Sequence, residues 1–140
     1  MGKRIILIGA DFSNCAVDNE DVIVDVPVSF NWEYNGKYIL KSDGTLTDLN
    51  TWKTSEFINV PQGAIAVKGY IFGHPTVANV ACYDSNGTYL GGFNKTPDRQ
   101  GDYYFNISDF PSGTVKVRVC SDVVSGGGTE VTVIFEVVSN

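Results

Sequence analysis

The amino-acid sequence predicts an all-β fold, a two-sheet antiparallel jelly-roll sandwich. Short segments of alternating apolar and polar residues recur at roughly 8–12-residue intervals, as in sandwiches and barrels. Turn-forming residues separate these segments, and the chain contains 15 Gly. No segment shows the 3.6-residue apolar period of an amphipathic helix. Because 140 residues fit one domain, we assign residues 1–140 to a single sandwich.

The first residues, 1–20, predict a leader strand followed by a polar loop. Residues 3–9 are largely apolar and strand-like, whereas residues 11–21 are mostly polar. Residues 21–26 alternate weakly and predict the next strand. Pro27 then removes a backbone donor, which places a bend or an edge strand there.

The next segments predict a hairpin and a long loop. Asn35-Gly36 lies between the strand-like residues 30–34 and 37–40 and predicts a β-hairpin, since Asn and Gly tolerate positive φ. Residues 41–53 are polar, so we expect a surface loop that ends at Trp52. Long loops often carry function, which makes this one the first candidate for a binding rim.

The middle of the chain predicts two strands and its clearest hairpin. Residues 56–60 form a short strand that stops at Pro61, and residues 64–72 form a longer one with apolar and aromatic faces. Residues 77–93 carry alternating apolar residues on both sides of Asp84-Ser85-Asn86-Gly87. This pattern predicts a β-hairpin around which the rest of the sandwich is organised.

The last third of the chain predicts three more strands. Residues 102–107 form one, and residues 108–113 form a turn. Residues 114–120 and 130–138 alternate cleanly, so we expect their apolar side chains to face inward and Lys116 and Arg118 to face outward. The inward set contains Val115, Val117 and Val119 in the first strand and Val131, Val133, Phe135 and Val137 in the second. We expect Val117, Val119, Val133 and Phe135 to be core, and the first and last strands to pair or lie close, as in jelly rolls.

The three cysteines predict reduced thiols. The chain contains an odd number of cysteines, whereas a domain framed by disulfides usually contains an even number. Their spacing is also not that of metal ligands. They are Cys15, Cys82 and Cys120. We expect them to be buried or half-buried. Cys82 and Cys120 both lie in predicted strands, and a bridge between neighbouring strands is the alternative.

Charge and hydropathy exclude several classes of partner. The formal net charge is −6 and no cluster of Lys and Arg offsets it, so we expect no nucleic acid partner. No apolar run is long enough to span a membrane, and the run at residues 5–8 is too short for a signal peptide. We therefore expect a protein that folds in the cytoplasm, or one domain of a longer exported chain.

The sequence does not predict an enzyme. Histidine occurs once, at His74, and no Gly-x-Ser-x-Gly motif is present; the 16 acidic residues leave a carboxylate pair only as a weak alternative. Asp84, Asn86 and Asp102 carry the oxygens that calcium prefers, but turn chemistry explains Asp84 and Asn86 equally well. We expect no cofactor, with calcium as the alternative.

The aromatic residues are the strongest indication of a binding site. Seven Tyr, eight Phe and two Trp are more than a small core hides comfortably, and Tyr and Trp suit stacking on sugar rings. Aromatic residues in or beside loops, or on polar strand faces, are the best candidates. The expected ligand-binding residues are Trp52, Tyr70, Tyr89 and Tyr103, with Asp84 and Asn86 as hydrogen-bonding partners. The competing interpretation places Trp32 and Trp52 in the core as plugs.

Five motifs follow one another in a distinctive order between residues 36 and 121. They are Gly36-Lys37-Tyr38-Ile39, Gly44-Thr45, Trp52-Lys53-Thr54-Ser55-Glu56-Phe57-Ile58-Asn59-Val60, Cys82-Tyr83-Asp84-Ser85-Asn86-Gly87-Thr88-Tyr89 and Phe110-Pro111-Ser112-Gly113-Thr114-Val115-Lys116-Val117-Arg118-Val119. In this order the chain resembles a jelly-roll module of bacteriophage tail-fibre, head-fibre and baseplate proteins and of gut-bacterial surface proteins. The resemblance implies a carbohydrate-binding or adhesive module within a larger assembly, and it carries no catalytic motif.

Two functions therefore compete. The first is a non-catalytic carbohydrate-binding or adhesion module, part of a phage fibre or a bacterial surface assembly, whose partner is a glycan or cell-surface polysaccharide. The second is a purely structural virion or assembly subunit without glycan binding. A homo-oligomer such as a trimer is compatible with either role.

Overall fold

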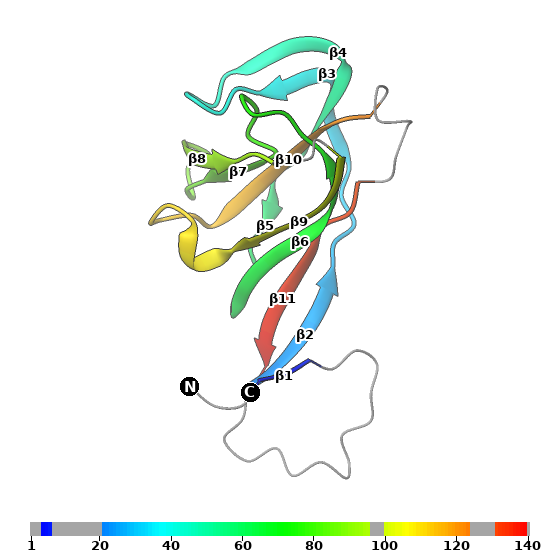
Figure 1. The fold of residues 1–140 in the computed structure, drawn as a ribbon. Coiled ribbons are helices and arrows are strands. Elements are labelled where there is room, and N and C mark those ends of the chain that lie inside the picture. The colour runs from blue at the N-terminus through cyan, green and yellow to red at the C-terminus, as the bar shows by residue number, and fades with distance from the viewer. Residues whose placement is uncertain (1–3, 7–20, 96–99, 124–130, 140) are drawn as a thin grey trace.

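The computed structural model describes residues 4–6, 21–95, 100–123 and 131–139. Within this part of the chain the structure consists of β-strands, turns and one 3-10 turn, Ile107–Asp109, and the strands form two sheets that pack together (Figure 1). The predicted all-β sandwich is therefore confirmed.

The first sheet has the strand order β1-β2-β11-β6-β9. Its strands are β1 (Arg4–Ile6), β2 (Asp21–Pro27), β6 (Ala64–Phe72), β9 (Gln100–Asn106) and β11 (Ile134–Ser139). The second sheet has the order β3-β4-β10-β7-β8, with β5 as an additional partner of β10. Its strands are β3 (Trp32–Ile39), β4 (Leu46–Ser55), β5 (Ile58–Asn59), β7 (Val80–Tyr83), β8 (Tyr89–Phe93) and β10 (Lys116–Asp122).

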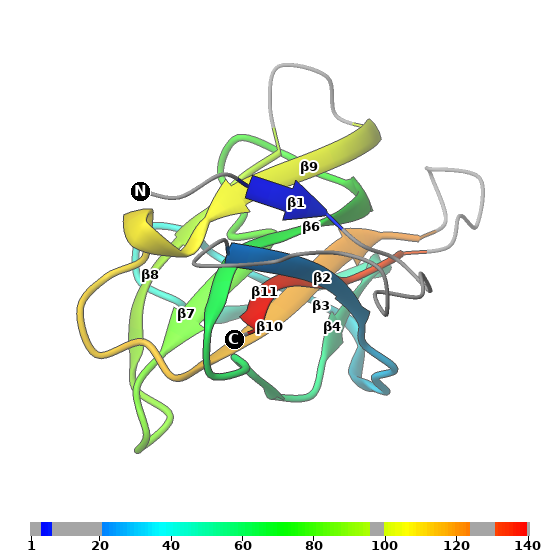
Figure 2. The same cartoon turned by 90° about the horizontal axis from the view of Figure 1, so that it is seen from below.

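The strand order is that of a jelly roll, because the chain passes repeatedly from one sheet to the other. The last strand, β11, lies between β2 and β6 and is antiparallel to both. The pairing of strands near the two chain ends is thus as expected, although the partner of β11 is β2. Strand β1 joins β2 in parallel, the one departure from antiparallel pairing among the described strands. Figure 2 views the molecule from the end where these three strands meet.

The main core fills the space between the sheets. Val117, Val119 and Phe135 are fully buried and Val133 is 2% exposed, so all four core predictions are confirmed. The core also contains stacked aromatic rings, with Phe93 and Phe105 at 5.1 Å between centroids. Trp32 is half-buried against this cluster, with its ring edge-to-face on Phe30.

The predicted hairpin at residues 77–93 is present. Strands β7 and β8 pair across a turn in which Asp84 Oδ1 accepts hydrogen bonds from the backbone N–H groups of Asn86 and Thr88, both at 2.9 Å. Gly87 has a φ of +80°, which an L-residue rarely adopts. The turn residues and the alternating strand pattern therefore both predicted the hairpin that the structure contains.

The hairpin expected at Asn35-Gly36 is wrong. Strand β3 continues through this dipeptide, and its register against β4 shifts between Asn35 and Lys37. Asn35 pairs with Lys53 and Lys37 with Asp48, so residues 49–52 of β4 bulge out opposite Gly36, which has a φ of +92°.

The long loop expected at residues 41–53 is also wrong. A short turn at residues 41–45 leads directly into β4, which pairs along β3. Residues 48–50 of β4 are solvent-exposed, which suits polar side chains, and pairing of residues 46–48 and 53–55 with β3 outweighs their low strand preference. The polar composition reflected an exposed strand rather than a loop.

Two side chains beside the core depart from expectation. Val115 was expected inside but is 45% exposed, because it precedes β10 at the end of the sandwich. Arg118 points away from the core as expected, yet it is only 7% exposed because the ring of Phe57 covers its guanidinium at 3.8 Å.

The two described cysteines are free and buried, as expected. Cys82 and Cys120 lie in neighbouring strands without forming a disulfide. Cys15 and most of the leader predicted for residues 1–20 lie outside the described residues.

Candidate ligand-binding site

A second apolar cluster lies on the face of the second sheet that points away from the main core. In β7, Val80 and Cys82 belong to the main core, whereas the alternate residues Ala81 and Tyr83 belong to this second cluster. Its buried members are Ile39, Trp52, Val77, Ala78, Ala81, Tyr83 and Cys120, with Tyr38, Leu46 and Tyr89 packed around them. The protein thus buries aromatic side chains on both faces of one sheet.

Segment 74–78, which follows β6, creates the cluster by attaching to the end of β3. Leu40 and Val77 form an antiparallel bridge. Lys41 donates its backbone N–H to the Thr76 carbonyl and Ala78 donates to the Ile39 carbonyl, both at 2.9 Å. These bonds hold Val77 and Ala78 over the outer face of the sheet, where they cover Trp52 and Cys120.

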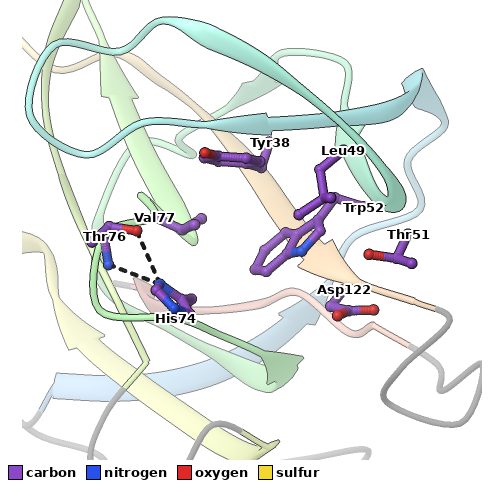
Figure 3. A pocket seen from close by; sticks show the side chains of 8 residues that line it. All are labelled: Tyr38, Leu49, Thr51, Trp52, His74, Thr76, Val77 and Asp122. Atoms are coloured by element: carbon purple, nitrogen blue, oxygen red, sulfur yellow. Dashed lines mark hydrogen bonds between the residues drawn. The ribbon is translucent and has the colours of Figure 1, made fainter.

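A pocket of about 360 Å³ opens beside this cluster (Figure 3). Its volume lies near the low end of the range for ligand pockets, about 300–1,000 Å³. The residues that line it are Tyr38, Leu49, Thr51, Trp52, His74, Thr76, Val77 and Asp122. Figure 3 shows His74, Thr76 and Val77 on one side and Trp52, Thr51 and Asp122 on the other.

Two aromatic rings provide the apolar part of this pocket. Trp52 and Tyr38 lie with ring centroids 5.7 Å apart and planes inclined by 55°. Trp52 is 3% exposed, so it forms the floor, whereas Tyr38 is half-buried and Leu49 is 44% exposed at the entrance. A ligand would therefore contact the edge of Trp52 and more of Tyr38 and Leu49.

The polar part of the pocket contains hydrogen-bonding groups of both kinds. His74 Nδ1 accepts the backbone N–H of Thr76 at 3.2 Å and lies 2.9 Å from Thr76 Oγ1. This arrangement closes a tight turn and leaves the proton of a neutral imidazole on Nε2. The Asp122 carboxylate and the Thr51 hydroxyl supply acceptors on the opposite side. The pocket therefore fits a small ligand that carries several hydroxyl groups beside an apolar face.

The thiol of Cys120, which lies next to the pocket, is too deeply buried to react with or bind a ligand there. Cys120 is fully buried below the pocket, and its Sγ donates to the Ala78 carbonyl at 3.0 Å. Desolvation raises the thiol pKa of Cys120 to about 12, so it stays protonated near neutral pH. A protonated thiol is a poor nucleophile and a poor metal ligand.

The six residues expected to bind ligand do not form one surface. Trp52 lines the pocket, and Tyr89 belongs to the same apolar cluster, with its hydroxyl donated to the Lys41 carbonyl at 2.6 Å. Burial raises the pKa of Tyr89 to about 12. Asp84 and Asn86 form the β7–β8 turn. None of these three lines the pocket.

The other two expected residues, Tyr70 and Tyr103, belong to the first sheet. Tyr70 is half-buried, and its hydroxyl accepts a hydrogen bond from Gln100 Nε2 at 2.6 Å. Tyr103 is 4% exposed and belongs to the main core, so the expectation that it lies on an outward face is wrong. Gly69 lies opposite Tyr103, where the Thr132 carbonyl accepts the Tyr103 hydroxyl at 2.9 Å. A tyrosine can therefore be buried here with its polar end satisfied.

The calcium alternative gains no geometric support. Asp84 and Asn86 lie in the β7–β8 turn of the second sheet, whereas Asp102 lies in β9 of the first sheet. In the described part of the chain, no group of three or more His, Cys, Asp or Glu side chains could hold a metal ion.

Sequence reasoning missed most of the pocket. Tyr38, Leu49 and Thr51 fell in segments expected to be a hairpin strand and a loop, and Asp122 lies at the end of β10. The one available signal was His74-Pro75, a turn dipeptide that follows a long strand and carries the only histidine.

Comparisons of the chain with protein-family models, with curated proteins and with solved structures found no match. Over the residues that the structure describes, no helix has the length and apolar character needed to cross a membrane.

Proposed function

We propose that the protein is a non-catalytic carbohydrate-binding or adhesion module that holds a sugar in the Trp52 pocket. One observation carries the proposal: a pocket of about 360 Å³ combines two aromatic rings with hydrogen-bonding groups on opposite sides. A sugar has apolar C–H faces and a rim of hydroxyl groups. Tyr38 and the edge of Trp52 would contact the apolar face, and His74, Thr51 and Asp122 would bind the hydroxyls.

The proposed setting is a phage fibre or a bacterial surface assembly. The order of motifs between residues 36 and 121 supports this setting. The alternative is a structural subunit of such an assembly that binds no glycan. Exposed apolar side chains such as Phe57, Tyr104 and Val115 favour contacts with another protein surface and keep this alternative open.

A glycan array with the purified protein tests the proposal. The wild type should bind at least one class of glycan, and Tyr38→Ala should weaken binding by about fivefold, because one ring contact contributes on the order of 1 kcal/mol. His74→Ala should weaken it as well. Tyr70→Ala is the matched control, since Tyr70 is also half-buried but belongs to the other sheet.

Circular dichroism on each variant separates lost binding from lost folding. If folded Tyr38→Ala and His74→Ala variants both bind glycan as tightly as the wild type, the Trp52 pocket is not the binding site. No binding by the wild type to any glycan, together with an obligate trimer in light scattering, would support the structural subunit instead.

A further inference from the structure

A second depression adjoins the Trp52 pocket. It measures about 420 Å³ and is lined by Leu40, Lys41, Ser42, Pro75 and Thr76. Thr76 also lines the Trp52 pocket, so the two cavities meet at this residue. We refer to this second cavity as the Lys41 depression.

The two cavities share one supporting backbone. The bridge between Leu40 and Val77 and the bond from Lys41 N–H to the Thr76 carbonyl lie where the cavities meet. Tyr38, in β3, lines the first cavity, and Leu40, which bridges Val77 just beyond the end of β3, lines the second. Because the two cavities share Thr76, we treat them as two successive subsites of one groove.

The two subsites carry opposite charges. The Trp52 pocket contains the Asp122 carboxylate, which is 4% exposed and disfavours an anion there. The Lys41 depression contains the exposed ammonium of Lys41. Within the described residues, this ammonium contacts the neutral amide oxygen of Asn94 at 2.5 Å rather than a carboxylate. Its positive charge therefore remains available to a ligand.

The charge of the whole chain limits what this groove can bind. A net charge of −6 repels a densely charged polyanion such as a nucleic acid, and one lysine does not offset it. A ligand with one carboxylate next to a neutral ring matches both subsites. A uronic acid linked to a neutral sugar has this pattern.

We infer that the groove recognises an acidic glycan, with a neutral sugar in the Trp52 pocket and the adjoining uronic acid in the Lys41 depression. The inference rests on the proposed function, because it assigns the class of glycan to the same site. Lys41 would pair with the uronic carboxylate, while Ser42 and Thr76 would offer hydroxyl groups to the same sugar.

An array that carries each neutral oligosaccharide beside its uronic-acid counterpart tests the inference. The wild type should bind the acidic member of a pair more tightly than the neutral member. Lys41→Gln should weaken the binding of the acidic member by about twofold to fivefold, as for the loss of an exposed ion pair. Binding of the neutral member should not change. Lys37→Gln is the matched control, because Lys37 lies in β3, four residues before Lys41, and already pairs with Asp48. Added NaCl should reduce the preference, since salt screens exposed charges.

The outcomes separate this inference from the proposed function. Equal binding of both members, a preference that survives Lys41→Gln, or monosaccharides bound as tightly as disaccharides would overturn the inference and leave a sugar-binding module. No glycan binding at all would overturn the proposed function and the inference together.

Discussion

Replacing Arg118 with alanine should destabilise the fold far more than removing an ordinary surface arginine. The Arg118 guanidinium lies 3.8 Å from the centroid of the Phe57 ring, and its Nη1 donates to the Ser55 carbonyl and to Glu33 Oε1, both at 2.8 Å. The Glu33 side chain is 42% exposed, so solvent screening limits that ion pair to about 1 kcal/mol or less.

The buried contacts set the size of the effect. A hydrogen bond from a charged donor contributes about 1.5–3 kcal/mol, and a desolvated cation–π contact contributes up to about 2 kcal/mol. Since such terms do not add fully, we expect Arg118→Ala to lower the free energy of unfolding by about 3 kcal/mol. For a chain of this length, that corresponds to a fall in Tm of roughly 10 °C.

Urea unfolding followed by circular dichroism measures this loss. Glu33→Gln is the control that removes only the exposed ion pair, and it should cost less than about 1 kcal/mol. The reasoning fails if Arg118→Ala also costs less than about 1 kcal/mol. It fails equally if Glu33→Gln costs as much as Arg118→Ala, because the ion pair would then be the dominant contact.

Two further predictions concern the core and the buried acids. Val119→Asp should abolish folding, because an unpaired buried charge costs several kcal/mol against a total stability of about 5–15 kcal/mol. The control variant Val119→Ala should stay folded. A soluble Val119→Asp protein with a native circular dichroism spectrum would contradict this prediction. Stability should also fall in alkali, since burial raises the thiol pKa of Cys82 and Cys120 from 9.0 to about 12 and the pKa of Tyr89 from 10.0 to about 12. The folded state then holds these protons more tightly than the unfolded state, so the stabilisation is complete below about pH 9 and declines as the pH rises toward 12. Urea midpoints measured from pH 8 upward test this, and a midpoint that stays constant to pH 11 would refute it.

The sequence predicts those parts of the fold that depend on neighbouring residues. The β7–β8 hairpin follows from alternation and from the Asp84 turn, and the burial of Val117 and Phe135 follows from strand periodicity. Strand β4 could not be predicted in this way, since its polar residues are strand-forming only when β3 lies alongside.

The candidate pocket is harder to predict because distant parts of the chain meet there. Pairing of β4 with β10 brings Thr51 and Asp122 together, and His74 joins them when segment 74–78 attaches to the end of β3. Aromatic content pointed to Trp52, which is buried and lines the pocket, but it could not tell an aromatic residue at a surface from one such as Tyr103, whose hydroxyl finds a partner inside the core.

The pairing of β2 with β11 determines how this protein can be mounted on a larger structure. Val22 and Ser139 lie opposite each other in register, so β2 begins beside the end of β11. These strand ends lie at one end of the molecule, and the β3–β4 hairpin lies at the other (Figure 1). We expect a trimeric scaffold fused next to Ser139 to leave the Trp52 pockets accessible, since Tyr38, Leu49 and Trp52 belong to β3 and β4. If each Trp52 pocket binds a glycan weakly, avidity on a glycan-coated surface would exceed the affinity of one pocket by about 10²–10⁴.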